Sequence, residues 1–332
     1  MSSKASAANQ VLRVGVVGAG VMGTNHARVL AGLPGVELVG IVDPLPAHRT
    51  RASQMIGCPT FATLDEMLDA KPDAVTIAAP THLHREVSLA CIARKIHLLV
   101  EKPIASTVEE GHEIVTAARE AGVTLMVGHV ERFNPAVAAI KQAIKDEEIL
   151  SIAITRVGPF PPRMSNVGVV IDLAVHDIDL IRWFTESDIV DVQPQLASAV
   201  AEREDIALLQ FRTASGVLAH INTNWLTPFK ARTVTVATRG KYVQGDLLTR
   251  QVTECFGFQT DGSYSMRHLS VGHDEPLRAE LIAFLDAVRG GKVPAVTGDE
   301  GVASLEIAIK CLEAPAGSIA APLRKGPRAV AS

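Results

Sequence analysis

The sequence predicts an α/β protein with two parts. The N-terminal part is a doubly wound parallel sheet, and the C-terminal part is an α+β domain with a largely antiparallel open sheet. Strand-like apolar runs alternate with helix-like segments over the first 130 residues, whereas strand-like runs separated by short turns dominate from Ile149 onward. At 332 residues the chain is long enough for about two domains.

The composition limits the class of protein and its partners. Hydrophobic residues make up 47% and charged residues 20%, which is ordinary for a soluble globular protein. A net charge of -4 without a basic block argues against a nucleic-acid partner. No apolar run is typical of a membrane span or a signal peptide, so we expect a cytoplasmic protein without a membrane partner.

The four cysteines show neither metal-ligand spacing nor a paired framework. We therefore expect them to be reduced and mostly buried, and the sequence predicts no metal site. They are Cys58, Cys91, Cys255 and Cys311.

The first element is a strand over residues 11–17, which runs directly into Gly18-Ala19-Gly20-Val21-Met22-Gly23 and a helix-like segment through Leu30. Strand, glycine turn and helix form the dinucleotide-binding fingerprint in its required context. Gly18 permits the tight turn, Gly20 lets the backbone approach a pyrophosphate, and Gly23 allows close packing of helix on strand. We therefore predict a Rossmann domain whose turn from Gly18 to Met22 contacts the cofactor.

A second strand, residues 36–42, ends in Asp43, about 20 residues beyond the glycines, where an acid binds the adenosine ribose. A carboxylate there bonds the 2′-hydroxyl and repels a 2′-phosphate, so we predict NAD in preference to NADP. Arg49 and Arg51 leave the choice open to some degree, although we expect both on a solvated helix face.

The next strand covers residues 74–79, and a helix then begins at Pro80-Thr81, with Thr81 as its N-cap. We count Pro80, Thr81 and His84 among the cofactor-binding candidates. Two interpretations of His84 remain open. It either contacts the nicotinamide side of the cofactor or serves as a local hydrogen-bonding residue.

The following strand ends in Leu98-Leu99-Val100-Glu101-Lys102-Pro103. Ligands bind at the carboxyl ends of parallel strands, so Lys102 is the first candidate catalytic residue. Glu101 and Lys102 are both cofactor-binding candidates as well. Pro103 restricts the backbone just beyond the lysine. The alternative is a solvated surface lysine paired with Glu101.

A helix over residues 108–121 stops at Gly122, and a strand over 123–127 follows. Pro135 starts a helix to about residue 145. The stretch 217–225 alternates, with Val217 and every second residue facing one way, and pairs with 205–212. Further strands are expected at 232–238 and 242–253, with turns at Arg239-Gly240 and Gly245-Asp246.

Such a sheet has one face for a helix and one left over, which predicts a subunit interface of a homodimer or homotetramer. The prominent helix covers residues 168–184. Its Asp172 and His176 share a face, as do His176 and Asp179 to within a turn. Burying an acid and an imidazole is costly unless they serve one another or a ligand, so a structural pair and a catalytic pair both remain open.

Two closing helices are expected from Glu275-Pro276 to about residue 289 and over 298–313, while His268 and His273 fall in a loop. We expect a disordered tail over residues 1–10, the Rossmann domain over 11–130, a substrate-binding and oligomerisation domain over 131–315, and a loose tail over 316–332.

Together these motifs resemble the glucose-fructose oxidoreductase and inositol dehydrogenase (Gfo/Idh/MocA) family of NAD(P)-dependent sugar dehydrogenases. The resemblance rests on the glycine turn, on Glu101-Lys102-Pro103 and on Asp172-x-x-x-His176. One departure is Lys95, where the family usually has a turn glycine, and we expect it to strain the helix end by up to ~1 kcal/mol.

Residues 128–135 and 156–163 resemble the subgroup that oxidises UDP-N-acetylglucosamine at its 3-hydroxyl. Guanidinium groups suit the diphosphate of a nucleotide sugar. The substrate-binding candidates are Arg132, Asn134, Arg156, Arg163, Asp172 and His176.

The resemblance implies hydride transfer between a sugar carbinol carbon and the nicotinamide. His176 takes the hydroxyl proton, oriented by Asp172 or Asp179, while Lys102 stabilises the developing alkoxide. Alternatives are a dehydrogenase of a free sugar or inositol, and a non-catalytic dinucleotide sensor of the same fold. The presence of Lys102, Asp172 and His176 favours an enzyme.

Overall fold

The computed structural model describes residues 11–161 and 167–314, so Arg163 and both predicted tails lie outside the described residues. The chain divides into two compact units, residues 1–133 with 274–305 and residues 134–273 with 306–332. The sequence placed all of 131–315 in one domain, whereas residues 274–305 return to the first unit. They return because helix α9 (Pro276–Gly290) packs on helix α2 (Val21–Ala31) and on the short helix η2 (Val130–Phe133).

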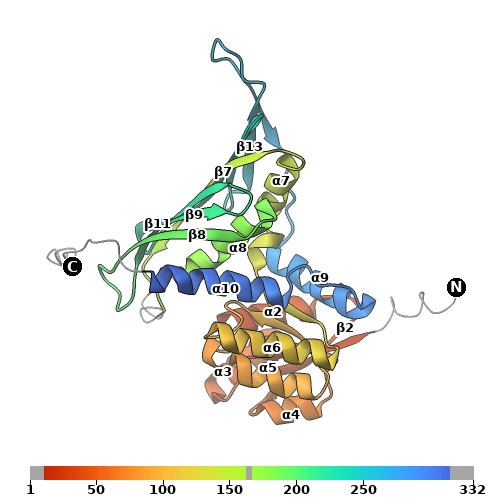
Figure 1. Cartoon of the computed structure of the whole chain (residues 1–332). Helices are drawn as coiled ribbons and strands as arrows, with labels where there is room; N and C mark the ends of the chain where they lie inside the picture. The colour runs from red at the N-terminus through yellow and green to blue at the C-terminus, as the bar shows by residue number, and fades with distance from the viewer. Residues whose placement is uncertain (1–10, 162–166, 315–332) are drawn as a thin grey trace, which may run out of the picture. The chain divides into compact units, whose positions relative to one another are not determined.

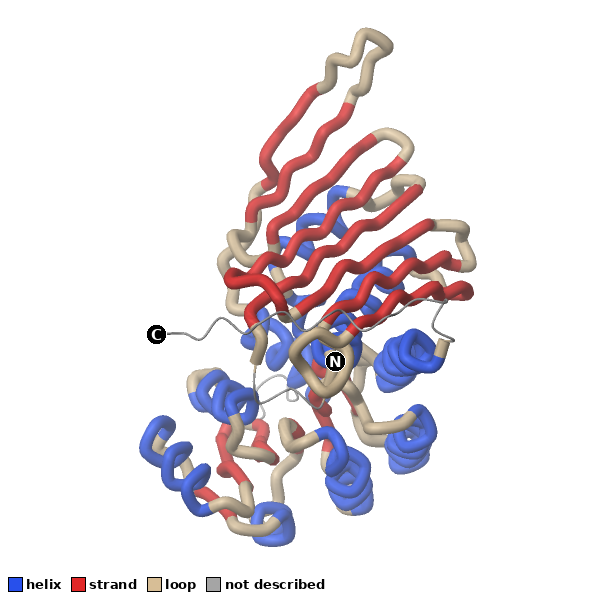
Figure 2. The backbone as a smooth tube through the Cα atoms, turned by 90° about the vertical axis from the view of Figure 1, so that its left-hand side faces the viewer, coloured by secondary structure: helices blue, strands red, loops and turns tan. Residues whose placement is uncertain are grey.

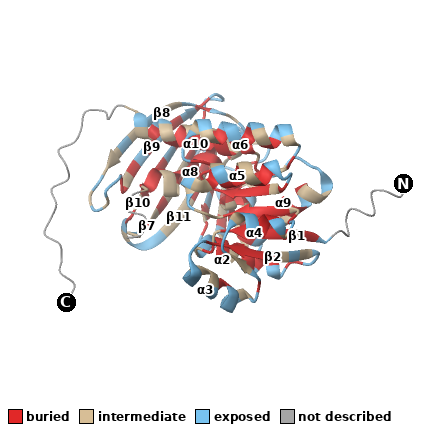
Figure 3. Cartoon of the chain, turned by 90° about the horizontal axis from the view of Figure 1, so that it is seen from below, coloured by how far each residue is buried: buried red, intermediate tan, exposed pale blue. Residues whose placement is uncertain are grey.

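The first unit is built on a six-stranded sheet in the order β3-β2-β1-β4-β5-β6, and every pair in it is parallel. This is the strand order of a doubly wound Rossmann sheet, as predicted. Figure 3 colours much of this sheet as buried, because helices pack against it. Its strands are β1 (Leu12–Val17), β2 (Val36–Val42), β3 (Thr60–Phe61), β4 (Ala74–Ile77), β5 (His97–Glu101) and β6 (Leu125–Gly128).

The remaining helices of this unit are α3 (Pro46–Ile56), α4 (Leu64–Asp69), η1 (Thr81–Leu83), α5 (His84–Ala93) and α6 (Val108–Ala121). Gly122 ends α6 in the left-handed conformation, as predicted. Lys95 has φ +59°, which confirms the strained position after α5. The prediction for Thr81 was wrong, because Pro80 precedes η1 and no side chain caps it.

The second unit contains an eight-stranded sheet in the order β14-β13-β12-β11-β7-β10-β9-β8. Among its described pairs only β7 with β10 is parallel, and β9 with β10 is antiparallel as predicted. Its strands are β7 (Ile149–Pro159), β8 (Ile189–Ala197), β9 (Ile206–Thr213), β10 (Leu218–Asn224), β11 (Leu226–Thr238), β12 (Lys241–Asp246), β13 (Gln251–Phe256) and β14 (Ser265–Leu269).

Two local predictions for this sheet were wrong. Gly245 and Asp246 belong to β12, and the turn lies just beyond them because Asp246 Oδ1 accepts from the amides of Leu248 and Thr249. His268 lies in β14, where its Nδ1 is 3.2 Å from Thr253 Oγ1.

The two faces of this sheet differ, as the alternation along β10 predicted. Ala219 and Ile221 are buried, whereas Leu218, which precedes them, is 60% exposed, and His220 between them is exposed as well. The buried face packs with helices α7 (Pro135–Ala143) and α8 (Val175–Thr185), and Figure 2 shows the helices of this unit on one side of its strands. The other face carries exposed apolar side chains, among them Leu208, Leu218, Tyr242 and Met266.

The segment predicted as one α-helix over 168–184 begins instead with a π-helical turn, Val170–Ala174, which leads into α8. Gly168 (φ +85°) precedes it, and a Cβ there would lie 2.1 Å from Glu204 Oε1. Backbone amides of Val169 and Val170 donate to Glu204, to its carbonyl and carboxylate oxygens respectively. Short π-helical turns often occur at functional sites. The π turn therefore supports Asp172 as a candidate site residue.

The last helix, α10 (Gly298–Glu313), starts in the first unit and ends in the second (Figure 1). No described helix is long and apolar enough to cross a membrane. Cys58, Cys91 and Cys311 are buried free thiols and Cys255 is half-buried, as expected.

Candidate active site

The glycines of the turn after β1 have different reasons to be glycine. A Cβ on Gly18, whose φ is +95°, would lie 2.6 Å from the Ala78 carbonyl oxygen, and one on Gly23 would lie 1.8 Å from the Gly18 carbonyl oxygen. A Cβ on Gly20 would meet nothing within 4 Å. Gly18 and Gly23 therefore serve the packing of the protein itself, whereas Gly20 leaves open space for a ligand.

Helix α2 begins at this open position. Its N-cap, Gly20, has no side chain to bind the first amides, and its first turn contains no acidic residue. Val21 and Met22, in the same turn, are 52% and 38% exposed. The amide donors and the positive end of the helix dipole thus fit the pyrophosphate of a dinucleotide.

Asp43 lies at the carboxyl end of β2 and is buried. Its Oδ2 accepts from the Ala19 amide at 2.8 Å and its Oδ1 from the Leu45 amide at 2.9 Å, so it orients the glycine turn. A carboxylate held there fits an adenosine ribose. The Arg49 and Arg51 guanidinium groups donate to the carbonyls of Asp43 and Ala19. Both residues lie on α3, where Arg51 is exposed, as predicted, and Arg49 is half-buried.

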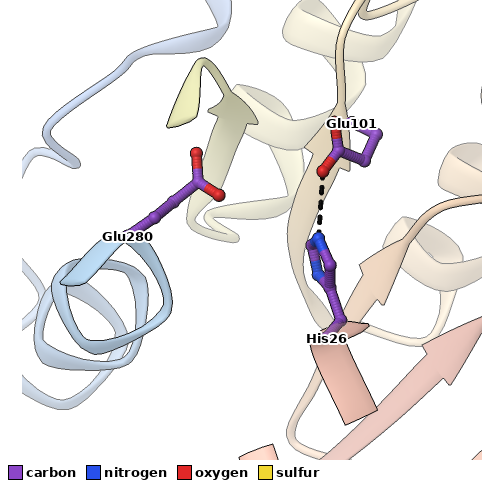
Figure 4. Close-up of side chains that lie close together, drawn as sticks. All are labelled: His26, Glu101 and Glu280. Carbon is purple, nitrogen blue, oxygen red and sulfur yellow. Dashed lines mark hydrogen bonds and ion pairs between the residues drawn. The ribbon is translucent and has the colours of Figure 1, made fainter. Parts of the chain in front are cut away.

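The carboxyl end of β5 carries a buried pair that the sequence reasoning missed. Glu101 Oε1 lies 2.9 Å from His26 Nε2, and Glu101 Oε2 accepts from the Lys102 amide at 3.2 Å (Figure 4). Burial opposes ionisation of Glu101, yet the hydrogen bond and charge of His26 hold its pKa below the ordinary value. The only sequence signal for His26 is an imidazole on the buried side of α2.

The Glu101 carboxylate is therefore engaged inside the fold, and the charge of Lys102 also helps to hold its pKa down. Lys102 is half-buried immediately after it, and its peptide bond to Pro103 is cis. The hydrogen bond from its amide to Glu101 Oε2 holds the Lys102 backbone beside a buried carboxylate.

His84 lies beside the same strand ends. Its Nε2 is 2.9 Å from the Ala79 carbonyl oxygen and its Nδ1 is 3.0 Å from that of Pro103. Burial lowers the pKa of His84, although these carbonyl groups act in the opposite direction. His84 is thus a local hydrogen-bonding residue, and its contact with a nicotinamide stays a prediction.

In the second unit, the π turn carries Asp172 and the first turn of α8 carries His176. Both side chains are half-buried, whereas Asp177 and Asp179 are buried. Asp172 and His176, which the sequence analysis named as catalytic candidates, are therefore more accessible than Asp177 and Asp179.

The predicted substrate residues of this unit have strong partners inside the fold. Arg156 Nε lies 2.9 Å from Asp177 Oδ2, and its Nη2 lies 2.7 Å from Oδ1. The two side chains are 3% and 0% exposed. Asn134 caps α7 through the Ala136 amide and donates to the Leu247 carbonyl.

In the first unit, Arg132 donates to Glu300 Oε1 at 2.7 Å, and its side chain is 3% exposed. These contacts give Arg132, Asn134 and Arg156 structural tasks, and their substrate contacts stay predictions.

Comparison with known proteins matches both units. Residues 12–129 match the oxidoreductase family with an NAD-binding Rossmann fold, and residues 140–243 match the GFO/IDH/MocA C-terminal domain. Inositol 2-dehydrogenase 4 of Saccharopolyspora erythraea is 30% identical over 312 residues, which cover 89% of this chain and 91% of the relative.

A UDP-N-acetylglucosamine 3-dehydrogenase of Acidithiobacillus ferrooxidans is 28% identical over 281 residues, 83% of this chain and 88% of the relative. Its solved structure has a TM-score of 0.84 at 26% identity and covers 90% of this chain and 96% of its own. GenD2 from gentamicin A biosynthesis, solved in complex with NAD, has a TM-score of 0.79 at 25% identity, covering 91% and 93%. The glycine turn, the strand-end lysine and the whole-length matches together show that the chain belongs to the Gfo/Idh/MocA family of NAD-binding oxidoreductases.

Proposed function

We propose that the protein oxidises a secondary ring hydroxyl of a sugar with NAD, and that its substrate is UDP-N-acetylglucosamine, oxidised at the 3-hydroxyl. The observation that carries the general reaction is Lys102, half-buried at the carboxyl end of β5 in a dinucleotide-binding sheet. The similarity to the 3-dehydrogenase in sequence and in fold supports the choice of sugar.

Each polar group has a task in this proposal. When bound, NAD accepts a hydride at C4 of its nicotinamide. The Lys102 ammonium donates a hydrogen bond to the substrate oxygen and stabilises the negative charge that develops there. His176 takes the hydroxyl proton, and Asp172 or Asp179 orients its ring.

The proposed cofactor is NAD in preference to NADP. The Asp43 carboxylate is anchored by the Ala19 and Leu45 amides, so it cannot readily turn away from a 2′-phosphate, which it would repel. Arg51, which donates to the Ala19 carbonyl, is the group that could offset this repulsion.

A second substrate class, a free sugar or inositol, is favoured by a specific observation. Arg132 and Arg156 each have a carboxylate partner and almost no exposed side-chain surface, so these cations have charge compensation without a diphosphate. An inositol 2-dehydrogenase is also among the relatives that match nearly the whole chain.

We also propose that the exposed apolar face of the eight-stranded sheet joins subunits of a homodimer or homotetramer. Exposed apolar side chains such as Leu208 and Leu218 would lose contact with water there.

The test is NADH formation, followed by near-ultraviolet absorbance, with UDP-N-acetylglucosamine, free N-acetylglucosamine, UDP-glucose and myo-inositol. We expect turnover with UDP-N-acetylglucosamine and NAD and much weaker turnover with NADP. Turnover confined to myo-inositol or free sugar would establish the second class. Tight NAD binding with no turnover on any of these compounds would contradict the enzyme and favour a sensor.

A further inference from the structure

Three buried polar side chains of the first unit converge from three separate elements. His26 comes from α2, Glu101 from the end of β5 and Glu280 from α9. Their relative exposures are 0%, 7% and 0%. One nitrogen or oxygen from each lies within 4.8 Å of the other two, and Figure 4 shows the Glu280 carboxylate directed toward the Glu101–His26 pair.

The hydrogen bonds of this cluster are incomplete. His26 Nε2 and Glu101 Oε1 bind each other, and Glu101 Oε2 accepts from the Lys102 amide. Neither oxygen of Glu280 has a hydrogen-bond partner among the residues that the structure describes. Burying a carboxylate without a hydrogen-bond donor costs folding free energy. A cation or a hydrogen-bond donor beside Glu280 would remove this cost.

The charge of the cluster defines that partner. Two carboxylates buried beside an imidazole need two positive charges, which either two protons or one divalent cation can supply. Burial and the charge of Glu101 hold the pKa of Glu280 well above its ordinary value. A proton on Glu280 would neutralise it, but its hydroxyl would still lack an acceptor in this geometry.

A cation at the centre of the cluster would instead give all three side chains a partner at once. We propose that His26, Glu101 and Glu280 bind one divalent metal ion of the zinc type. An imidazole nitrogen with carboxylate oxygens is a donor set that zinc uses. Both Glu280 oxygens are available, so bidentate binding would complete four ligand atoms without any further residue.

The spacing of the ligand atoms suits this ion after a small adjustment. Three atoms at most 4.8 Å apart share a point within about 2.8 Å of each, while zinc bonds to nitrogen and oxygen are about 2.0–2.2 Å long. Side-chain movements of up to about 0.8 Å would bring the three atoms to these bond lengths. The proton of His26 would then reside on Nδ1, which lacks a partner with or without the ion.

Such an ion would act on the architecture of the unit. It would tie α2 and the end of β5 to α9, the helix that returns from the C-terminal part of the chain. The Lys102 amide, already bound to Glu101, would be fixed with it. The inference does not depend on the proposed substrate, because metal binding is measured without turnover.

The test uses the untagged full-length protein, stripped with a chelator and then titrated with Zn²⁺. The comparison is between Glu280→Gln, which keeps the shape and removes the charge, and Glu275→Gln. Glu275 is a half-buried glutamate at the start of α9 that pairs with Arg28. We expect about one zinc per chain, by elemental analysis after desalting, in the wild type and Glu275→Gln, and less than a tenth of that in Glu280→Gln. Zinc should raise the melting temperature of the wild type and of Glu275→Gln, and leave that of Glu280→Gln unchanged.

Two results would overturn the metal site. One is a wild type that retains no zinc and gains no thermal stability from it. The other is Glu280→Gln binding zinc as well as the wild type does. A Glu280→Gln variant that melts higher than a zinc-indifferent wild type would identify the two-proton state instead. If Glu280→Gln fails to fold, Co²⁺ substituted into the wild type decides, since a four-coordinate site gives visible absorption bands and their absence refutes the proposal.

Discussion

The two units of this protein place their functional groups by different means. In the first, the candidate cofactor site is made mainly of backbone, because a glycine turn and a bare helix N-terminus present amides, and two side-chain carboxylates lie at the ends of β2 and β5. In the second, side chains make the candidate site, since Asp172 lies in the π-helical turn and His176 in the first turn of α8. Asp177, next to His176 in the sequence, forms a buried ion pair with Arg156.

This difference between backbone and side-chain sites bears on how similar each unit is to the relatives. Backbone geometry needs only a few residue types, and the first unit matches a general NAD-binding family although the relatives are named for both inositols and nucleotide sugars. Side-chain sites change with single substitutions, so we propose that the second unit determines the choice of substrate. The predictions below separate the two kinds of site, beginning with the largest effect.

The largest effect is expected on turnover. Lys102→Ala and His176→Ala should each lower kcat by about 10²- to 10⁴-fold, because each removes a positioned group from the reacting oxygen. NAD affinity, measured by fluorescence titration, should stay within a few-fold in both. Full activity in either variant would show that the corresponding residue is not catalytic.

The next effect concerns the stability of the second unit. Asp177→Asn should lower the free energy of unfolding by about 3–5 kcal/mol, because it leaves Arg156 buried beside a neutral amide. Asp188→Asn, whose exposed carboxylate pairs with Arg182, should cost less than about 1 kcal/mol. Equal losses in urea denaturation would mean that burial of the Arg156 pair does not matter.

A pair of glycine variants tests the first unit. Gly23→Ala should lower stability by about 1–3 kcal/mol even without NAD, since its Cβ would overlap the Gly18 carbonyl. Gly20→Ala should leave the unliganded melting temperature unchanged and weaken NAD binding, because only the ligand approaches that position. Unchanged NAD affinity in Gly20→Ala would place the pyrophosphate elsewhere.

The smallest effect is a pH dependence at His84. Burial places its folded pKa below the ordinary 6.5, so near that pH the unfolded chain binds more protons than the folded one. His84 therefore supports stability fully above about pH 6.5 and less as the pH falls through its folded pKa. The melting temperature of His84→Gln should decline less than that of the wild type on acidification, and parallel declines would contradict this assignment.

The features that could be predicted from the sequence are those that depend on local signals. The glycine turn, the end of α6 at Gly122 and the alternation along β10 are local signals, and each predicted its element correctly. The return of residues 274–305 to the first unit is not local, and neither is the meeting of His26 with Glu280. No spacing in the chain indicates such contacts, because they form only when distant elements pack.

The π turn escaped prediction for another reason. The periodicity of residues 168–184 is helical throughout, and the distinction between π and α depends on one inserted residue and on the Glu204 contacts that hold the start. The arginine partners were missed similarly, since Asp177 looks like any helix acid until the fold buries it against Arg156.

The central proposal is that Lys102 and His176 act in the same catalytic step. A double-mutant cycle on kcat, with Lys102→Ala, His176→Ala and the double variant, tests this most directly. Groups that act as a unit lose their effect together, so the double variant should be about as slow as the slower single variant. Losses that multiply, with the double variant slower by the product of the two single effects, would contradict the claim.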